Sequence, residues 1–212
     1  MKRIITVQHP QSVHHTNGMI GSWTDWELTE TGKQQAENIA ENLRNELSGN
    51  KYILYSSDLL RAKQTAEIIA KRFAIESVYR KELRERNLGK CCGQSVQWLK
   101  DHMECEEKTI DDKVFSNAES RRDVWMRLKP FFDEIVSDDN ENIIIVSHGD
   151  LLSVFNTMFL GLEPEFLNNC EVFGISGGVS QMLINEDKRY IKRISDLSYL
   201  QINPDLHTAP KR

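Results

Sequence analysis

The stretch YILYSSDLLRAKQTA, residues 52–66, combines two patterns that together decide the fold of this chain. It opens with an almost wholly apolar run, residues 52–55, of the kind found in strands that are buried on both faces. A helical stripe follows at once, formed by Ala62, Ala66, Ile69, Ala70 and Phe73. We expect this strand and helix to form one unit of a parallel sheet.

The same alternation extends to both ends of the chain. Two further apolar runs, residues 4–7 and 143–146, predict buried strands. Two late strands are expected at residues 171–173 and 179–184, with the glycine-rich segment 174–178 as the turn between them.

Two more helical stripes lie between these strands. The first contains Ala36, Ile39, Ala40, Leu43 and Leu47, with Thr29 as the expected N-cap and Gly49 as the stop. The second contains Val124, Leu128, Phe131, Phe132 and Ile135, and Pro130 is expected to kink this helix or reset its start. Strands that alternate with helices predict a three-layer α/β/α sandwich with a mixed, mainly parallel sheet.

The length and composition suit a single domain. We expect residues 1–202 to form it, with an acidic, polar insertion at about residues 90–118 over one edge of the sheet. Residues 203–212 contain two prolines and end in two basic residues, and we expect them to form a loose tail. The sequence does not predict whether the protein is a monomer or a homodimer.

Charge, hydropathy and cysteine content exclude several functions. The formal net charge of -5 argues against a nucleic-acid partner, which requires a basic face. No apolar stretch reaches the roughly 18 residues of a membrane span. The four cysteines show no C-x-x-C spacing, and we expect free thiols in a reducing cytoplasm.

Polar residues follow each of the first three predicted strands. Gln8 and His9 follow the first strand, Ser57 and Arg61 the second, and His148 the third. Ligands of open α/β sheets bind outside the carboxyl ends of the parallel strands, so these clusters should meet at one crevice. Two histidines and an arginine at that crevice favour an anionic substrate.

The ordered motifs resemble those of the histidine phosphatase superfamily, which includes the cofactor-dependent phosphoglycerate mutases. VQHPQS at residues 7–12 stands where the family carries Arg-His-Gly. The other matches are LTETG at 28–32, SSDLLRAKQTA at 56–66, LRERNLG at 83–89 and VSHG at 146–149. The likeness extends from residue 4 to about residue 186.

The resemblance implies a role for each matching residue. His9 attacks phosphorus and becomes a phosphohistidine, while Arg61 and His148 contact the phosphoryl oxygens. Glu85 protonates the leaving oxygen and later activates water. The implied substrate-binding residues are Gln8, Ser12, His15, Gly21, Arg86 and Gly149. The family uses no metal, and no cofactor is expected. We therefore expect an enzyme that hydrolyses a small phosphate monoester.

Three positions depart from the family pattern. Gln8 replaces an arginine, Pro10 replaces a glycine, and His15 stands where many relatives have a phosphate-facing asparagine. Loss of one donor aimed at transition-state charge can lower a rate by about 10²–10³-fold. Hence the alternative is a phosphoester-binding or regulatory protein with little turnover. We also consider that a protonated His15 restores part of the missing charge.

Phosphoglycerate mutase activity is a less favoured alternative. Segment 90–118 is short compared with what dedicated glycolytic mutases carry there, and it lacks a further basic cluster for a second phosphate. We expect substrate specificity to lie in this segment and in loop 19–26. A serine hydrolase is not supported, because the chain lacks a Gly-x-Ser-x-Gly elbow.

Non-catalytic interpretations exist for several of these residues. Arg61 could pair with Asp58 or Glu67 at the surface, and Glu85 could belong to a solvated charge cluster. Arg86 is either a surface charge or a substrate contact. Ser57 could serve only as a helix N-cap.

Other residues near these motifs have structural interpretations too. In an extended segment His14 and His15 point to opposite faces, which argues against joint metal ligation. Trp23 and Trp26 either line the substrate mouth or pack the loop. Glu119 is expected to begin a helix.

Overall fold

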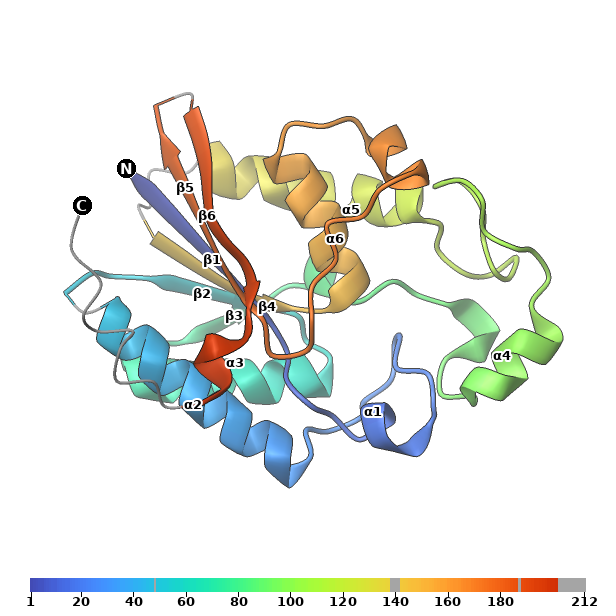
Figure 1. Cartoon of the computed structure of the whole chain (residues 1–212), viewed down its shortest axis with the longest axis horizontal. Coiled ribbons are helices and arrows are strands. Elements are labelled where there is room, and N and C mark those ends of the chain that lie inside the picture. Colours follow the sequence, from blue (N-terminus) through green and yellow to red (C-terminus); the bar gives the residue numbers. More distant parts are fainter. Residues whose placement is uncertain (48, 138–141, 187, 202–212) are drawn as a thin grey trace.

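A six-stranded sheet with the order β3-β2-β4-β1-β5-β6 forms the centre of the protein (Figure 1). This computed structural model describes residues 1–47, 49–137, 142–186 and 188–201. The strands are β1 (Lys2–Gln8), β2 (Ile53–Ser56), β3 (Ser77–Tyr79), β4 (Asn142–Ser147), β5 (Val179–Asn185) and β6 (Lys188–Asp196). The pairs β1–β4, β4–β2 and β2–β3 are parallel, whereas β1–β5 and β5–β6 are antiparallel. The mixed, mainly parallel sheet that the sequence predicted is confirmed.

Helices cover both faces of this sheet. The helices are α1 (His14–Asn17), α2 (Glu30–Glu46), α3 (Leu60–Phe73), α4 (Val96–His102), α5 (Arg121–Ser137) and α6 (Gly149–Phe159). Short 3-10 turns are η1 (Lys81–Leu83), η2 (Gly89–Cys91), η3 (Pro164–Asn168) and η4 (Leu197–Leu200). One layer contains α2 and α3 and the other contains α5 and α6 (Figure 1). The three-layer α/β/α prediction is therefore correct.

Strand β4 shows why its sequence is apolar throughout. Its residues Ile143 and Ile145 belong to the hydrophobic cluster under α5 and α6, whereas Ile144 and Val146 belong to the cluster under α2 and α3. Successive side chains of a strand point to opposite faces. Both faces of β4 are buried, so every position requires an apolar side chain.

Two predictions about the strands need correction. Residues 171–173, expected to be a strand, have no regular secondary structure. Strands β3 and β6 were not predicted, because both lie at edges of the sheet and carry exposed or charged side chains. Edge strands of this kind lack the buried apolar pattern on which the prediction relies.

The helix ends differ from expectation in two places and agree with it in a third. Helix α5 runs from Arg121 through Pro130, so the proline does not reset its start. Proline has no N–H to donate to the carbonyl of Met126, four residues earlier. Both residues lie on the exposed face of α5, and Met126 is 65% exposed, so the helix tolerates this loss. Glu119 precedes α5 and does not begin it. Thr29 caps α2 as predicted, because its side chain accepts from Gly32 N at 3.0 Å.

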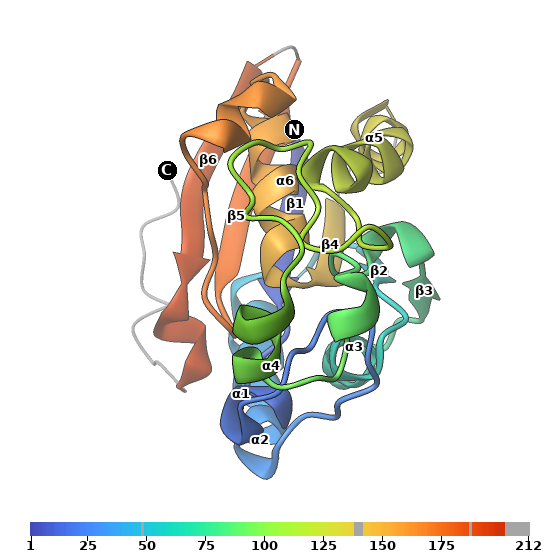
Figure 2. The ribbon, with the colours of Figure 1, turned by 90° about the vertical axis from the view of Figure 1, so that its right-hand side faces the viewer.

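Helices α1 and α4 and the loops around them lie beyond the carboxyl ends of the strands (Figures 1 and 2). The segment expected as an insertion, residues 90–118, therefore covers the strand ends and not an edge of the sheet. It shares a small hydrophobic cluster with loop 19–26 through Ile20, Cys91 and Phe115. That it is an insertion into a single domain stays a prediction.

Two remaining expectations concern the tail and the membrane. The predicted loose tail, 203–212, lies outside the described residues. None of the helices in the described part of the chain has the length and apolar character needed to cross a membrane.

Candidate active site

The three polar clusters that follow β1, β2 and β4 come together as the sequence predicted. His9 N donates to Ser147 O at 3.0 Å, and Ser57 N donates to Val146 O at 3.0 Å. These bonds extend the parallel ladders one residue beyond the strands. Consequently the first residue after each strand lies at the same end of the sheet.

His9 is buried, with 3% of its surface exposed, and its hydrogen bonds define which ring nitrogen is free. His9 Nδ1 lies 2.9 Å from Pro10 O. Since a carbonyl oxygen only accepts, Nδ1 carries the proton and Nε2 has the lone pair. Burial and the nearby charge of Arg61 hold the pKa of His9 well below its usual value, so the ring is neutral at pH 7.

Arg61, in the first turn of α3, donates from Nε to His9 Nε2 at 3.1 Å. Its other nitrogens hold it in place, because Nη1 donates to Thr24 O and Nη2 donates to Ser22 O, each at 2.9 Å. The Arg61 side chain is only 1% exposed. Burial lowers the pKa of Arg61 to about 10, which still leaves a buried cation at pH 7.

The surface-pairing interpretation of Arg61 is therefore wrong. Asp58 instead accepts two hydrogen bonds from Arg84, at 2.6 Å from Nε and 2.7 Å from Nη2. This bidentate pair leaves Arg61 without a carboxylate partner in the described part of the chain.

His148 follows β4 and lies at the N-terminus of α6. Its Nε2 is 2.8 Å from Ser57 Oγ, and its ring centroid is 5.1 Å from that of His9. His148 Nδ1 is buried and has no hydrogen-bond partner. The N-cap position of α3 is taken by Leu59, but Ser57 Oγ accepts from Leu59 N at 3.3 Å, so the hydroxyl contacts both the start of α3 and the His148 ring.

Glu85 lies at the N-terminus of α6. Its Oε1 accepts from Leu151 N at 3.2 Å and from Arg86 N at 3.0 Å. Desolvation, followed by repulsion from Asp150, raises the pKa of Glu85 to about 7, and the charge of Arg61 acts in the opposite direction. The carboxyl group is only partly exposed, so the solvated-cluster interpretation is wrong. A carboxyl group with this pKa can donate a proton near neutral pH.

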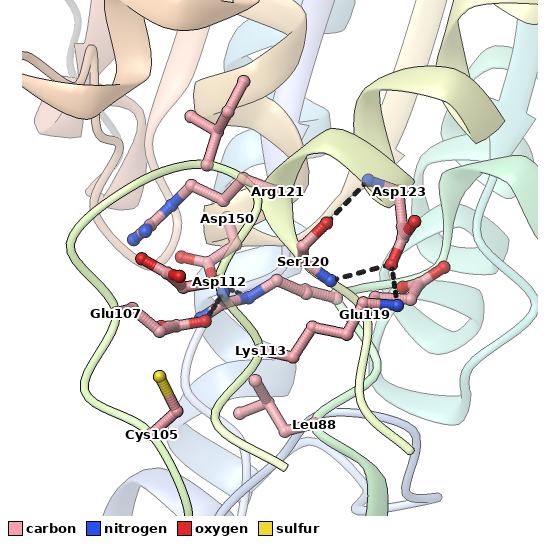
Figure 3. Close-up of polar contacts among 12 residues, drawn as sticks. Leu88, Cys105, Glu107, Asp112, Lys113, Glu119, Ser120, Arg121, Asp123 and Asp150 are labelled. Atoms are coloured by element: carbon pink, nitrogen blue, oxygen red, sulfur yellow. Dashed lines mark hydrogen bonds and ion pairs between the residues drawn. The ribbon is translucent and has the colours of Figure 1, made fainter. Parts of the chain in front are cut away.

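Arg86 is 6% exposed, which contradicts the surface-charge interpretation. Its Nη1 lies 2.5 Å from Glu107 Oε1, and its Nε lies 3.0 Å from Asp150 Oδ2. Figure 3 shows the Glu107 side chain on the covering segment (residues 90–118) and the Asp150 side chain on α6. Two carboxylates pair with Arg86, and its role as a substrate contact stays a prediction.

The Gln8 side chain lies in a narrow space between two glycines. A Cβ at Gly149 would lie 3.3 Å from Gln8 Nε2, and one at Gly174 would lie 2.8 Å from Gln8 Oε1. Gln8 Oε1 is buried without a hydrogen-bond partner. Gln8 therefore lies beside Gly149, the first residue of α6. Both residues belong to the predicted substrate-binding set.

Ser12, His14 and His15 form a second group beside His9. Ser12 Oγ lies 2.8 Å from His14 Nδ1, and Ser12 N donates to His15 Nδ1 at 3.2 Å. The His15 ring stacks on that of His9, with centroids 5.4 Å apart. A Cβ at Gly21 would lie 2.8 Å from His14 Nε2, so Gly21 leaves room for the His14 ring.

These contacts overturn two expectations. His15 Nδ1 accepts a hydrogen bond, and burial together with Arg61 lowers the pKa of His15, so it is neutral at pH 7 and restores no positive charge. His14 and His15 are helical and not extended, and their ring centroids are 4.1 Å apart. The argument that they point to opposite faces is wrong.

Loop 19–26 and the covering segment, residues 90–118, are joined by backbone contacts. Met19 pairs with Ser95 in an isolated bridge, and Ile20 N donates to Gln94 O at 2.8 Å. Trp23 Nε1 donates to Glu85 O at 2.6 Å, and Trp26 Nε1 donates to Ile20 O at 3.3 Å. Both indoles therefore hold the loop, which favours their packing interpretation.

Several residues that contact the predicted set were given no role in the site from the sequence. Asp150 could have been predicted as a site residue, because it directly follows His148 and Gly149 and lies in the first turn of α6. Ser22 gave no signal; its φ of 46° turns its carbonyl toward Arg61. His14 and Ser57 were noticed but given structural interpretations.

The chain matches known proteins over most of its length. The model of the family "Histidine phosphatase superfamily (branch 1)" matches residues 4–197. A probable phosphoglycerate mutase of Erwinia tasmaniensis is 28% identical over 211 residues, which cover 95% of this chain and 96% of the relative. Phosphoserine phosphatase 1 of Hydrogenobacter thermophilus is 26% identical over 196 residues, covering 90% of each chain.

A solved structure shares the fold. Mycobacterial glucosyl-3-phosphoglycerate phosphatase, in a complex with VO3, superposes with a TM-score of 0.80 at 22% identity. The match covers 92% of this chain and 99% of that one. The names of these proteins include both a probable mutase and phosphatases.

Proposed function

Because the chain belongs to the histidine phosphatase superfamily (branch 1), we propose that it hydrolyses small phosphate monoesters through a phosphohistidine on His9. The observation that carries the proposal is the 3.1 Å hydrogen bond from Arg61 Nε to His9 Nε2. It places a buried cation beside the lone pair of a neutral imidazole. A phosphoryl group that displaces this bond would meet a nucleophile and a counter-charge together.

In the first step, His9 Nε2 attacks phosphorus and the bond from phosphorus to the ester oxygen breaks. His9 Nδ1–H keeps its bond to Pro10 O, which supports the positive charge on the ring. Arg61 and the unpartnered His148 Nδ1 would bind the phosphoryl oxygens. Glu85, protonated below about pH 7, transfers its proton to the leaving oxygen.

In the second step, water attacks the phosphohistidine. The Glu85 carboxylate left by the first step takes a proton from that water, and the bond from phosphorus to nitrogen breaks. His9 returns to its neutral form and inorganic phosphate leaves. The backbone N–H groups of Asp150 and Leu151 stabilise the Glu85 carboxylate between the two steps.

Hydrolysis is favoured over the mutase reaction by the pairing of Arg86. A bisphosphate needs a second cationic contact, whereas Glu107 and Asp150 already neutralise Arg86. The specific rival is a phosphoester-binding protein with little turnover, favoured by Gln8 in place of the pocket arginine. The two differ in whether a bound phosphoryl group is released.

The test measures phosphate release from an aryl phosphate by the full chain and by His9→Ala. His102→Ala is the matched control, because His102 is an exposed imidazole whose ring stacks on Trp98 and whose Nδ1 bonds to Trp98 O. We expect turnover in the full chain and the control, none in His9→Ala, and incorporated phosphate that is labile in acid and stable in base.

Two results would count against hydrolysis in different ways. Vanadate or phosphate binding without turnover would support the binding-protein alternative. Absence of turnover, of phosphate incorporation and of anion binding would reject a phosphoryl site at His9 altogether.

A further inference from the structure

We propose that His9, His14 and His15 form a binding site for a divalent transition-metal ion, of which Zn²⁺ is the best-fitting example. One ring nitrogen from each residue lies within 4.8 Å of the others. Imidazole nitrogen is a common ligand of Zn²⁺, with bonds of about 2.0–2.1 Å. In the described part of the chain this is the group of histidines, cysteines and carboxylates that meets that distance.

The surroundings of two rings already fit metal ligation. Ligating histidines usually give their second N–H to a carbonyl or another acceptor, and this contact orients the ring. His9 Nδ1 does so to Pro10 O at 2.9 Å, which leaves Nε2 for the metal. His14 Nδ1 lies 2.8 Å from Ser12 Oγ, a hydroxyl that can accept from Nδ1–H, and in that tautomer His14 Nε2 is available too.

The third ring requires a rearrangement. His15 Nδ1 accepts from Ser12 N at 3.2 Å, so its proton is on Nε2. The His15 ring must turn, because it is stacked on His9 at 12° and imidazole lone pairs lie in the plane of each ring; the turn frees a nitrogen for the metal at the cost of this one hydrogen bond. Because the His15 side chain is exposed, the ring can turn and close the remaining distance without displacing the core.

Arg61 determines what completes the coordination. Its Nε–H occupies the His9 Nε2 lone pair, so metal binding must displace this hydrogen bond. A bare cation beside the guanidinium would be repelled. Three protein ligands leave a fourth position open in tetrahedral Zn²⁺, and a hydroxide or phosphate oxygen there would face Arg61 and offset the repulsion.

Metal binding and catalysis compete for the same nitrogen. A metal on His9 Nε2 removes the lone pair that attacks phosphorus, so Zn²⁺ would inhibit the enzyme and a chelator would restore it. This consequence rests on the proposed function, whereas binding itself does not.

The test titrates ZnCl₂ into the chelator-treated full chain by calorimetry, with a reductant present. Co²⁺ is titrated in parallel, because nitrogen-ligated tetrahedral Co²⁺ gives an intense visible absorption band. The variants are His14→Gln and His15→Gln, and the control is His102→Gln. Thermal unfolding checks that each variant is folded.

We expect one Zn²⁺ per chain and the tetrahedral Co²⁺ band in the full chain and in the control. Each cluster variant should bind at least about 100-fold more weakly, since changes to outer-shell contacts alone cost 10–100-fold. Retained affinity in both cluster variants, or no binding to the full chain, would overturn the proposal. Loss of binding in a folded His102→Gln variant would do the same.

If the proposed function fails, the two proposals separate cleanly. A chain that binds Zn²⁺ through the cluster but never turns over a phosphate ester would retain the metal site and lose the enzymatic proposal. A chain that turns over esters with no cluster-dependent Zn²⁺ binding would do the reverse.

Discussion

Asp150 acts on Glu85 in two opposing ways. Its backbone N–H lies 3.4 Å from Glu85 Oε2 and favours the carboxylate, while its own carboxylate repels that charge and raises the pKa of Glu85. Desolvation adds to the repulsion and brings the pKa to about 7. The site therefore holds a carboxyl group that gains and loses its proton near neutral pH.

The first prediction concerns the pH dependence of turnover. A proton donor must be protonated, so kcat for an alkyl phosphate should be highest below about pH 7 and fall above it as Glu85 ionises. His9 is already neutral in this range, so its titration does not mask the decline. A pH profile of kcat checks this, and a rise through pH 8 would contradict it.

The second prediction is that Asp150→Asn shifts this decline to lower pH. The substitution removes the negative charge that raises the pKa of Glu85 and leaves Arg86 with one carboxylate partner fewer. The loss of this negative charge favours the Glu85 carboxylate. The measurement is again kcat against pH, and Glu107→Gln is the control, because that carboxylate contacts Arg86 but is not among the groups that set the pKa of Glu85.

The third prediction is that Glu85→Gln depends on the leaving group. The variant should lower kcat for an alkyl phosphate by about 10²–10⁴-fold, because an alkoxide needs protonation. An aryl phosphate should be affected much less, since phenolate leaves without full protonation. Equal losses for both substrates would show that Glu85 does not act as the proton donor.

The fourth prediction concerns Ser57. Ser57→Ala removes the partner of His148 Nε2 and leaves both ring nitrogens unpartnered, which should cost about 1–3 kcal/mol of stability. We also expect kcat/KM to fall at least about tenfold as the ring loses its orientation. Ser56→Ala is the control: its hydroxyl is equally buried but donates to Ser57 O. Similar kcat/KM losses in both variants would contradict this role.

The fifth prediction concerns Gln8. Gln8→Arg should raise kcat/KM, by up to about 10²–10³-fold if the guanidinium reaches the transition-state charge. Gln8→Met, which has a similar shape but no donor, should lower it. If neither substitution changes kcat/KM, position 8 does not contact the phosphoryl group.

Much of the site could be predicted because strand ends are easy to recognise. His9, Ser57 and His148 each follow an apolar run, and a parallel sheet brings such positions together whatever the side chains are. The charge state of these residues could not be predicted. His15 looked suited to supply a positive charge, yet desolvation and Arg61 keep it neutral.

The three-layer fold and the residues that follow its strands could be predicted from the sequence alone, because apolar periodicity and the alternation of strands with helices are visible along the chain. Only the tertiary structure decided which partners those residues have: Arg61 on His9, two carboxylates on Arg86, and three imidazoles within 4.8 Å. Arg61 is far from His9 in the sequence, and Arg86 is far from its two carboxylates, whereas the three imidazoles are near neighbours that the short helix α1 brings together in space. Hydrogen bonds, burial and metal-binding geometry depend on distances in space, and these cannot be read from a pattern in the sequence.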